Sequence, residues 1–442
     1  MKSTTIALAA ATLALGSSAF ADVTVNITGA TAFRVPTLDS IKARFVASGQ
    51  PFKFAHDRNT GNNQSFNGAT RTIFQGTFPG VSGVTTIRTS FNGSVEGIKA
   101  LVDSPTSDPT YLETSVLDSI TATVGGNNGG LGKGSTTSPV AKAQSDIAYS
   151  DVSIAATPYA ANALQPSTPE AGVVVFTMIA NEGAAGILDN LNTQNFRALY
   201  AAGVLPLSYF TGDATDTDYV FASGRNDGSG TRTTYLAETG YGIATAVNQY
   251  VVGRTAGDTI TAIYRVPQGG TSAGLAAIVP ALTLSSGNAS TIWGLNVNGN
   301  GGYSSGSALR DDMARTSASV AVYDVDGSEL GSGLNIHLVT FLSLGDAGPA
   351  RTAGAVVLGY NGVKLNDFAT SSTLSAADTA KVTQGAYTAW SFQQMYRRND
   401  ITSGDKVLVY DGIKNNLVLG TTGIIATAMN VGRQVDGGVV TP

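Results

Sequence analysis

The segment Arg225–Thr231 combines the side chains and backbone groups that bind an oxyanion. Arg225 offers a planar fork of N–H donors that matches paired oxygens, and Ser229 and Thr231 add hydroxyl groups. Glycine at 228 and 230 lets backbone amides approach a ligand closely, and the next residues, 232–238, are predicted to form a helix. Because the N–H groups at a helix start favour a negative charge, the segment predicts an oxyanion ligand.

Other segments share this character, because each places a turn with small or hydroxylated residues where a strand gives way to a helix. They are Gly29–Phe33, Gly93–Ser94 and Ser150–Asp151. In an open α/β sheet such turns lie at the carboxyl ends of strands, where ligands bind. Helix caps use the same residue types, so each segment taken alone is equally consistent with a structural role.

A hydrolase motif is present but incomplete. Gly270–Gly274 fits the Gly-x-Ser-x-Gly pattern around a nucleophile, Ser272, and His337 follows with Asp324 and Asp326 as candidate partners. The pattern requires a clean apolar strand before the serine, which the sequence lacks. We therefore expect a glycine-rich loop there, and no catalytic residue set.

Metal and nucleotide motifs are also incomplete. The segment Gly132–Ser135 lacks the hydroxyl that should follow the lysine of a phosphate loop, and the acidic turns 213–218 and 324–327 do not complete a calcium loop. With only 2 histidines in the chain, a multi-histidine metal site is not expected. Trp293 and Trp390 are interpreted as packing residues. No metal and no cofactor are predicted.

The first residues have the order of a cleavable secretory signal. Lys2 supplies the positive charge, residues 6–15 form a short apolar run, and Ala19–Ala21 presents a small-x-small cleavage pattern. A buried first strand or helix of a cytosolic protein is the alternative. We predict a signal peptide over 1–21 and a periplasmic or extracellular mature protein. Since the chain has no cysteine, no lipid anchor is expected.

Charge and length limit the function further. Without Lys2, 25 basic residues face 31 acidic ones, a net charge of −6, which argues against a nucleic-acid partner. A small anion remains compatible, because backbone amides and an arginine can make a local positive site. A chain of 442 residues exceeds what one hydrophobic core usually serves, so two lobes are expected.

The pattern along the chain alternates strands with helices. A strand at Val23–Ile27 and a turn at Gly29 precede a helix with Pro36 in its first turn and Gly49 at its end. Its apolar stripe is Leu38, Ile41 and Phe45. Residues 50–85 and 103–140 are interpreted mostly as loops or short hairpins. This first unit indicates an α/β fold.

Later units follow the same alternation. A helix is predicted over Ser94–Val102 with Ser94 as its cap, and a strand over Asp146–Tyr149. The nearly continuous apolar run Val173–Ile179 is typical of a parallel strand covered on both faces. A helix over Leu191–Tyr200 with Thr193 as its cap follows, and a buried strand is predicted at 355–358 after a glycine-rich stretch of about 80 residues. Together the units predict largely parallel sheets.

The segment Arg225–Thr231 resembles the Arg-x-Asp-Gly-Ser-Gly-Thr motif of the periplasmic phosphate-binding proteins of ABC transporters. Further segments are similar to that family's motifs in the same order: Gly29–Phe33, Gly93–Lys99, Ile147–Asp151, Leu191–Tyr200, Gly354–Tyr360 and Gly385–Ser391. The chain departs from the family at Glu96, where a small residue is usual, and at Thr388, which replaces a proline. Surplus length lies around 50–85 and 280–350.

The resemblance implies a two-lobed periplasmic-binding-protein fold, in which each lobe is a largely parallel sheet flanked by helices and hinge strands join the lobes. Lobe one would comprise residues 22–165 and the return segment 353–442, and lobe two residues 166–352. The implied ligand is inorganic phosphate or a related oxyanion, bound by a monomer that serves an ABC transporter. The phosphate-contacting residues implied are Thr31, Ala32, Phe33, Ser94, Asp151, Arg225, Ser229, Gly230 and Thr231. Either Thr31 or Ala32 occupies the position of the family's threonine.

Two rival functions stay open on the sequence. An extracellular phosphatase or other hydrolase could be built on the same lobes. A surface or matrix protein could keep the fold without binding a ligand.

Overall fold

A computed structural model describes residues 22–57, 69–130, 139–253, 259–266, 301–303, 305–325, 327–366, 374–418 and 424–442. The predicted signal peptide, the segment Gly132–Ser135, Ser272, Trp293 and Asp326 lie outside these ranges. No helix in the described ranges is long and apolar enough to cross a membrane.

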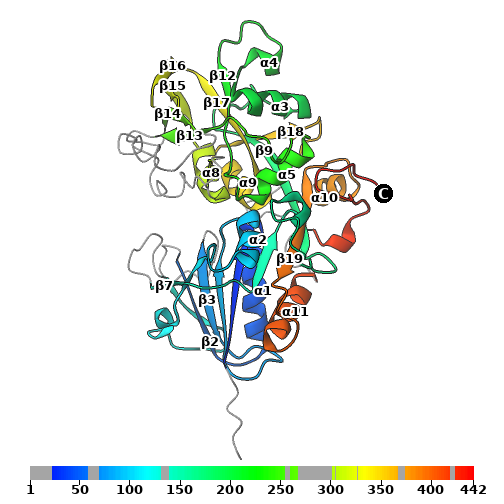
Figure 1. The fold of residues 1–442 in the computed structure, drawn as a ribbon. Coiled ribbons are helices and arrows are strands. Elements are labelled where there is room, and N and C mark those ends of the chain that lie inside the picture. The colour runs from blue at the N-terminus through cyan, green and yellow to red at the C-terminus, as the bar shows by residue number, and fades with distance from the viewer. Residues whose placement is uncertain are drawn as a thin grey trace, which may run out of the picture.

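The chain forms two parts that lie one above the other in Figure 1, each built of strands flanked by helices. The lower part holds the described strands and helices within residues 23–150 together with the helix at 405–418, and the upper part holds those within residues 190–360. Strands β9 (Gly172–Ala180) and β19 (Trp390–Arg397) pair with each other and lie between the two parts. The α/β class predicted from the sequence is confirmed.

One 13-stranded sheet, counted over the described residues, runs through both parts in the order β11-β12-β17-β9-β19-β8-β1-β4-β3-β2-β6. Off this path, β18 pairs with β9, and β10 pairs with β18. Its strands are β1 (Val23–Gly29), β2 (Phe52–His56), β3 (Arg71–Gly76), β4 (Thr85–Ser90), β6 (Asn127–Gly130), β8 (Ile147–Ser150), β9 (Gly172–Ala180), β10 (Asn190–Leu191), β11 (Val204–Pro206), β12 (Tyr219–Ala222), β17 (Ile336–Ser343), β18 (Val356–Tyr360) and β19 (Trp390–Arg397).

Two smaller sheets complete the β-structure of the described residues. One contains β13 (Tyr250–Gly253), β14 (Ile260–Arg265), β15 (Ser317–Tyr323) and β16 (Glu329–Leu334), and the other contains β5 (Thr110–Leu112) and β7 (Val140–Lys142).

Most of the helices follow a strand along the chain, after a turn or a loop. They are α1 (Arg34–Ala47), α2 (Ser94–Val102), α3 (Thr193–Ala202), α4 (Ser208–Thr211), α5 (Gly230–Glu238), α8 (Gly306–Met313), α9 (Leu344–Thr352), α10 (Ala376–Thr383) and α11 (Asp405–Val418). Short 3-10 helices are η1 (Thr31–Phe33), η2 (Thr114–Leu117), η3 (Ile154–Ala156) and η5 (Ala426–Ala428).

Strand direction is mixed within the large sheet. In the lower part β1 runs parallel to β4 and β8, and in the upper part β12 runs parallel to β17 and β10 to β18. Antiparallel pairs occur where β9 and β19 enter each part, and in the β2–β3–β4 meander. The antiparallel ladders therefore join and extend two parallel groups.

Strand β9 corrects one prediction. It is buried along its whole length, as the apolar run at Val173–Ile179 predicted, but its neighbours β17, β18 and β19 are all antiparallel to it. Burial on both faces explains the apolar composition and contains no information on direction. Because Val173–Val175 pair with β19 and Phe176–Ala180 with β17, β9 connects the two parts.

Helix α1 forms as predicted. Pro36 lies in its first turn, where its missing N–H is tolerated, and the chain turns at Gly49, which has φ +66°. The stripe Leu38, Ile41 and Phe45 is fully buried. The ring of Phe45 packs on rings from the β2–β3 hairpin, so part of the stretch 50–85 contributes to the core.

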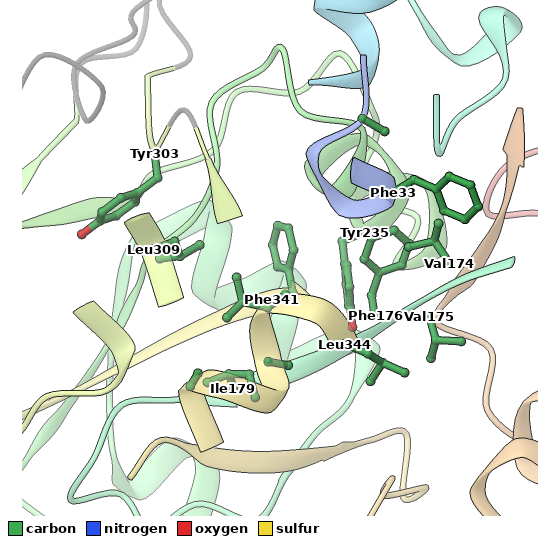
Figure 2. Close-up of a cluster of buried hydrophobic side chains, with 14 of the residues drawn as sticks. Phe33, Val174, Val175, Phe176, Ile179, Tyr235, Tyr303, Leu309, Phe341 and Leu344 are labelled. Carbon is green, nitrogen blue, oxygen red and sulfur yellow. The ribbon is translucent and has the colours of Figure 1, made fainter. Parts of the chain in front are cut away.

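The core of the upper part packs helix α5 onto the sheet (Figure 2). Tyr235 of α5 stacks on Phe341 of β17 with ring centroids 4.4 Å apart, and its edge meets Phe176 of β9. Strand β17 is buried at every residue, yet the sequence analysis did not identify it within the glycine-rich stretch. This packing determines where the first residues of α5 lie.

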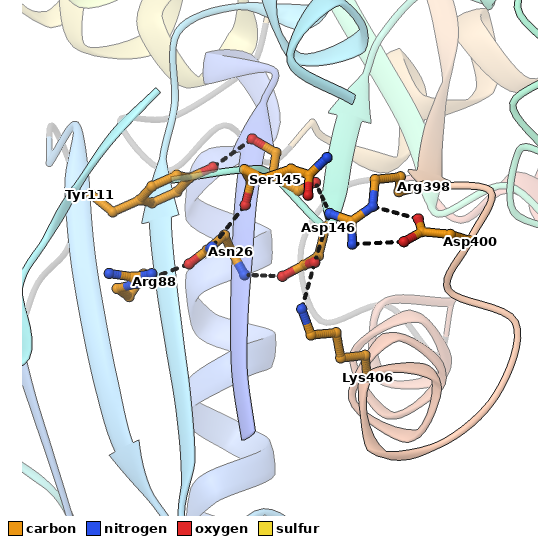
Figure 3. A network of polar contacts seen from close by, with 9 residues as sticks. Asn26, Arg88, Tyr111, Ser145, Asp146, Arg398, Asp400 and Lys406 are labelled. Carbon is orange, nitrogen blue, oxygen red and sulfur yellow. Dashed lines mark hydrogen bonds and ion pairs between the residues drawn. The ribbon is translucent and has the colours of Figure 1, made fainter. Parts of the chain in front are cut away.

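A charge network holds the lower part together (Figure 3). The buried carboxylate of Asp146 accepts hydrogen bonds from the backbone N–H of Asn26 at 2.9 Å and from Lys406 of α11 at 2.7 Å. Arg398 binds the same carboxylate at 3.2 Å and also contacts Asp400. Residues from β1, from the start of β8 and from the return segment therefore meet at one buried charge.

We predict that Asp146→Ala lowers the free energy of unfolding by about 3 kcal/mol, because Arg398 and Lys406 both lose contact with a buried carboxylate. Chemical denaturation monitored by circular dichroism measures this loss. Asp400→Ala is the matched control: its side chain is 65% exposed against 2% for Asp146, so a much smaller loss is expected. Equal losses in the two variants would contradict the role assigned to Asp146.

Candidate functional site

Arg225 lies where the two parts meet and is only 2% exposed. It follows β12 in the upper part, and its Nε donates to the backbone oxygen of Tyr303 at 3.0 Å. Its Nη1 lies 3.4 Å from the hydroxyl of Thr31, which belongs to the lower part. One guanidinium therefore contacts both parts.

Burial lowers the pKa of Arg225 to about 10, while the carboxylates of Asp346 and Asp151 act in the opposite direction. At neutral pH the side chain keeps its charge. A buried cation with donors directed toward the interface is the chemical requirement for recognising an oxyanion.

Thr31, Ala32 and Phe33 form η1, which leads directly into α1. Thr31 supplies the hydroxyl that meets Arg225, which favours Thr31 over Ala32 as the threonine of the site. The ring of Phe33 lies in the core, 6.0 Å from that of Tyr149, and Figure 2 shows it beside Val174. Ala32 and Phe33 have no polar side-chain atoms, so only their backbone groups could bind a ligand.

Asp151 is the other charged centre of the site and is 1% exposed. It follows β8, and its Oδ1 accepts a short hydrogen bond from Ser94 of α2. Its Oδ2 lies 3.5 Å from the hydroxyl of Thr231, and its backbone oxygen accepts from Thr234 at 3.3 Å, both from α5. The carboxylate is thus held between a helix of each part.

Burial raises the pKa of Asp151, and the charge of Asp436 acts in the same direction. The hydrogen bond from Ser94 and the charge of Arg225 oppose the shift. Burial therefore disfavours the ionised form of this carboxyl group, while its hydrogen bonds and the nearby guanidinium favour that form.

Helix α2 corrects the predicted role of Ser94. The cap position is Gly93, with φ +123°, and Ser94 is the first helical residue. Its hydroxyl binds Asp151 and does not cap its own helix. A Cβ built at Gly93 would overlap the backbone oxygen of Gly228, so glycine is required for this close approach. The N–H of Val95 donates to the same Gly228 oxygen at 3.2 Å.

Helix α5 begins within the motif that the sequence analysis identified. Ser229 caps it by accepting from the N–H of Arg232 at 3.3 Å, which leaves the hydroxyl proton of Ser229 for another acceptor. Gly230 lies directly against Asp151. The starts of α2 and α5 are therefore both adjacent to the Asp151 carboxylate.

Helix α3 has a different cap from the predicted one. Asn192 accepts from the N–H of Asn195 at 2.8 Å, and Thr193 is the first helical residue. The predicted buried face, Phe196, Leu199 and Tyr200, is confirmed.

Asp346 was not identified from the sequence, although its charge acts on Arg225 more strongly than that of Asp151. It lies in the first turn of α9, and a Cβ built at Gly306 would overlap its Oδ2 while lying 3.6 Å from Arg225 Nη1. Arg310 lies 3.7 Å from its other oxygen. Asp346 lies just after a strand and at the start of a helix, which is the pattern that singled out the other site segments. The sequence analysis did not identify strand β17, so this pattern was not recognised.

Arg34 was also missed. It is 5% exposed, directly follows Phe33 as the first residue of α1, and its charge lowers the pKa of Arg225. Two buried cations therefore lie near each other, a combination that favours an anionic ligand.

Glu96 and Asp227 form an acidic rim across the interface. Glu96 of α2 lies over Gly228, with its Cγ 2.6 Å from where a Cβ would stand. Burial, together with the charge of Glu96, raises the pKa of Asp227 to about 6, while Arg232 opposes the shift. The Glu96 departure noted in the sequence thus lies next to the segment Arg225–Thr231.

The hydrolase partners do not assemble. His337 lies in β17 with its Nε2 3.5 Å from Asp218, and burial lowers its pKa. Asp324, which the incomplete motif offered as a partner for His337, instead contacts Arg265 at 3.4 Å. Ser272 lies outside the described residues.

In the part of the chain that the structure describes, no group of three or more His, Cys, Asp or Glu side chains is arranged to hold a metal ion. Trp390 is fully buried beneath the guanidinium of Arg433, 4.4 Å from the ring centre, as expected of a packing residue.

We predict that Gly230→Ala separates α5 from Asp151, because the added Cβ would overlap Asp151 Oδ1 and Ser94 Oγ. Overpacking of this kind costs about 1 to 3 kcal/mol of stability, which thermal unfolding would measure. Gly345→Ala in α9 is the matched control, since a Cβ there meets nothing within 4 Å. An unchanged melting temperature for Gly230→Ala would argue against this close contact.

No family model matches the chain, and no curated protein matches it. Among solved structures it is similar to an ABC-type phosphate transport receptor from Vibrio cholerae, with 10% identity, a TM-score of 0.42, and 91% of this chain and 100% of that chain covered. It is also similar to a Clostridium perfringens protein solved with bound phosphate, with 11% identity, a TM-score of 0.40, and 90% and 97% of the chains covered. At these identities and TM-scores, the argument for function rests on the residues of the site.

Proposed function

We propose that this chain is an exported solute-binding protein that captures phosphate or a similar oxyanion between its two parts, for uptake by an ABC-type transporter. The observation that carries the proposal is the buried guanidinium of Arg225, which contacts Thr31 across the interface and lies near Asp151. Export rests on the signal pattern of residues 1–21.

The surroundings of Arg225 are suited to a tetrahedral anion. Hydroxyl groups of Thr31, Ser94 and Thr231 lie within the same set of contacts, and Ser229 stands at the start of α5. The helix starts of α2 and α5 add partial positive charge and backbone donors. A ligand here would exchange the contacts among these side chains for contacts to its own oxygens.

A ligand that binds next to the Asp151 carboxylate must carry a proton that it can donate to it. Phosphate keeps at least one proton near neutral pH and can donate it to a carboxylate, whereas sulfate has no such proton. An unpaired acceptor facing Asp151 would be repelled. The buried carboxylate therefore supports phosphate over sulfate.

Capture would be a hinge movement in which the parts separate and close again about β9 and β19. The contacts that closure would make are Val95 to Gly228, Thr234 to Asp151, and Arg225 to Thr31. The lobe boundaries proposed for this movement are 22–165 with 353–442, and 166–352.

We predict that Arg225→Ala weakens phosphate binding by about 2 to 5 kcal/mol, because it removes one side of a desolvated charge pair. Calorimetry on ligand-stripped protein measures the change. Arg265→Ala is the control, because Arg265 pairs with Asp324 in the separate four-stranded sheet. Unchanged affinity in Arg225→Ala would refute the assignment of this site.

We predict that Asp151→Asn allows sulfate to compete with phosphate, because the amide can donate where the carboxylate only accepts. Competition titrations on the parent and the variant test this expectation. If both keep the same preference for phosphate, Asp151 is not the residue that discriminates between the two anions.

A further inference from the structure

Residues 424–442, called the strap here, lie along the junction of the two parts. The strap begins beside β9, where the N–H of Val173 donates to the oxygen of Ile424 at 2.9 Å. It closes on itself through paired backbone hydrogen bonds between Gly432 and Thr441. Figure 1 shows this segment, in red, beside α5 and α10.

Arg433 attaches the strap to the upper part. Its Nη1 binds Glu238, the last residue of α5, at 2.7 Å, and both side chains are less than 10% exposed, at 4% and 8%. Its Nη2 donates to the backbone oxygen of Thr388 at 2.7 Å, and its guanidinium covers the ring of Trp390. A buried, hydrogen-bonded ion pair of this kind fixes the strap on α5.

Gly437 strengthens this attachment. It has φ +69°, and a Cβ built on it would overlap the backbone carbonyl of Ala237 in the last turn of α5. Val431 and Val440 of the strap also lie close to Gly385, at 3.2 and 3.1 Å from where a Cβ of that residue would stand. The strap therefore packs directly on the end of the helix whose start contacts Asp151.

Asp436 attaches the strap to the lower part. Its Oδ2 accepts from the backbone N–H of Ser153 at 2.8 Å and from the Ser153 hydroxyl at 2.6 Å. Ser153 lies two residues after Asp151, and the next residue, Ile154, donates to the hydroxyl of Tyr396 at 2.9 Å. The contact is therefore made to a segment that is itself held on β19.

We propose that the strap is a clamp that holds the two parts together and slows their separation. Because Arg433 and Gly437 attach the strap to α5 and Asp436 attaches it to Ser153, the parts cannot separate at Asp151 unless one of these two attachments breaks. The clamp acts on the conformation of the protein whatever the ligand, and only its effect on ligand exchange rests on the proposed function.

The test compares Asp436→Ala with the parent protein in a distance measurement. The chain has no cysteine, so Ala43→Cys on α1 and Gln194→Cys on α3, both exposed, provide the only thiols for a pair of spin labels. Without phosphate, we expect the distance distribution of Asp436→Ala to shift toward longer separations. Phosphate, added as the probe, should dissociate about tenfold faster, in keeping with the loss of two hydrogen bonds.

The matched control is Asp213→Ala. Asp213 also accepts from the backbone N–H and the hydroxyl of a single residue, Thr215, but both lie on the surface of the upper part. Ser153→Ala removes one of the strap contacts from the other side and should give a smaller shift in the same direction. It serves as the second variant if Asp436→Ala does not fold.

Distances in Asp436→Ala and Ser153→Ala that match the parent and the Asp213→Ala control would overturn the clamp. If phosphate binds neither the parent nor the variants while the distances still shift, the clamp stands and the proposed ligand is wrong. If phosphate binds and neither distances nor dissociation rates change, the clamp is wrong and the proposed function stands.

Discussion

Burying a guanidinium and a carboxylate in one interface is unfavourable unless each charge keeps partners that replace water. Arg225 and Asp151 meet this requirement only because segments far apart in the sequence converge on them. Tyr303, Thr31 and Asp346 surround the cation, and α2 and α5 hold the carboxylate. Much of the architecture can be understood as the means of bringing these groups together. An anion that enters would replace some of these partners and bring oxygens of its own.

Backbone proximity is the second condition, and glycine provides it. At Gly93 and Gly230 a side chain would overlap atoms of the opposite part, so the two helix starts approach more closely than other residues would allow. The sequence made these positions recognisable because glycine next to hydroxylated residues is a local pattern. Other local patterns were just as readable: the motif Arg225–Thr231, helix α1 and strand β1 could each be predicted from a short stretch of sequence.

The features that the sequence did not predict depend on contacts between residues far apart along the chain. Strand β17 lies in a glycine-rich stretch, and without it the turn that carries Asp346 had no visible context. The direction of β9 depends on its neighbours, which its own composition does not describe. The caps of α2 and α3 were each misplaced by one residue, because a hydroxyl at a helix start can bind its own helix or a distant partner. Ser94 binds the distant partner.

Because of the network around Asp146, the first segments of the chain cannot complete their fold until residues near its end are present. The Asp146 partner Lys406 lies 260 positions later, and helix α11, which carries Lys406, packs against α1 near the beginning of the chain. A ribosome or a translocation channel delivers residues in order, so the first strand and helix wait for almost the whole chain before their part is complete. Long-range closure of this kind slows folding and leaves apolar surface exposed in the meantime. For the export proposed above, this delay would keep the early segments from reaching a stable fold before the last ones arrive.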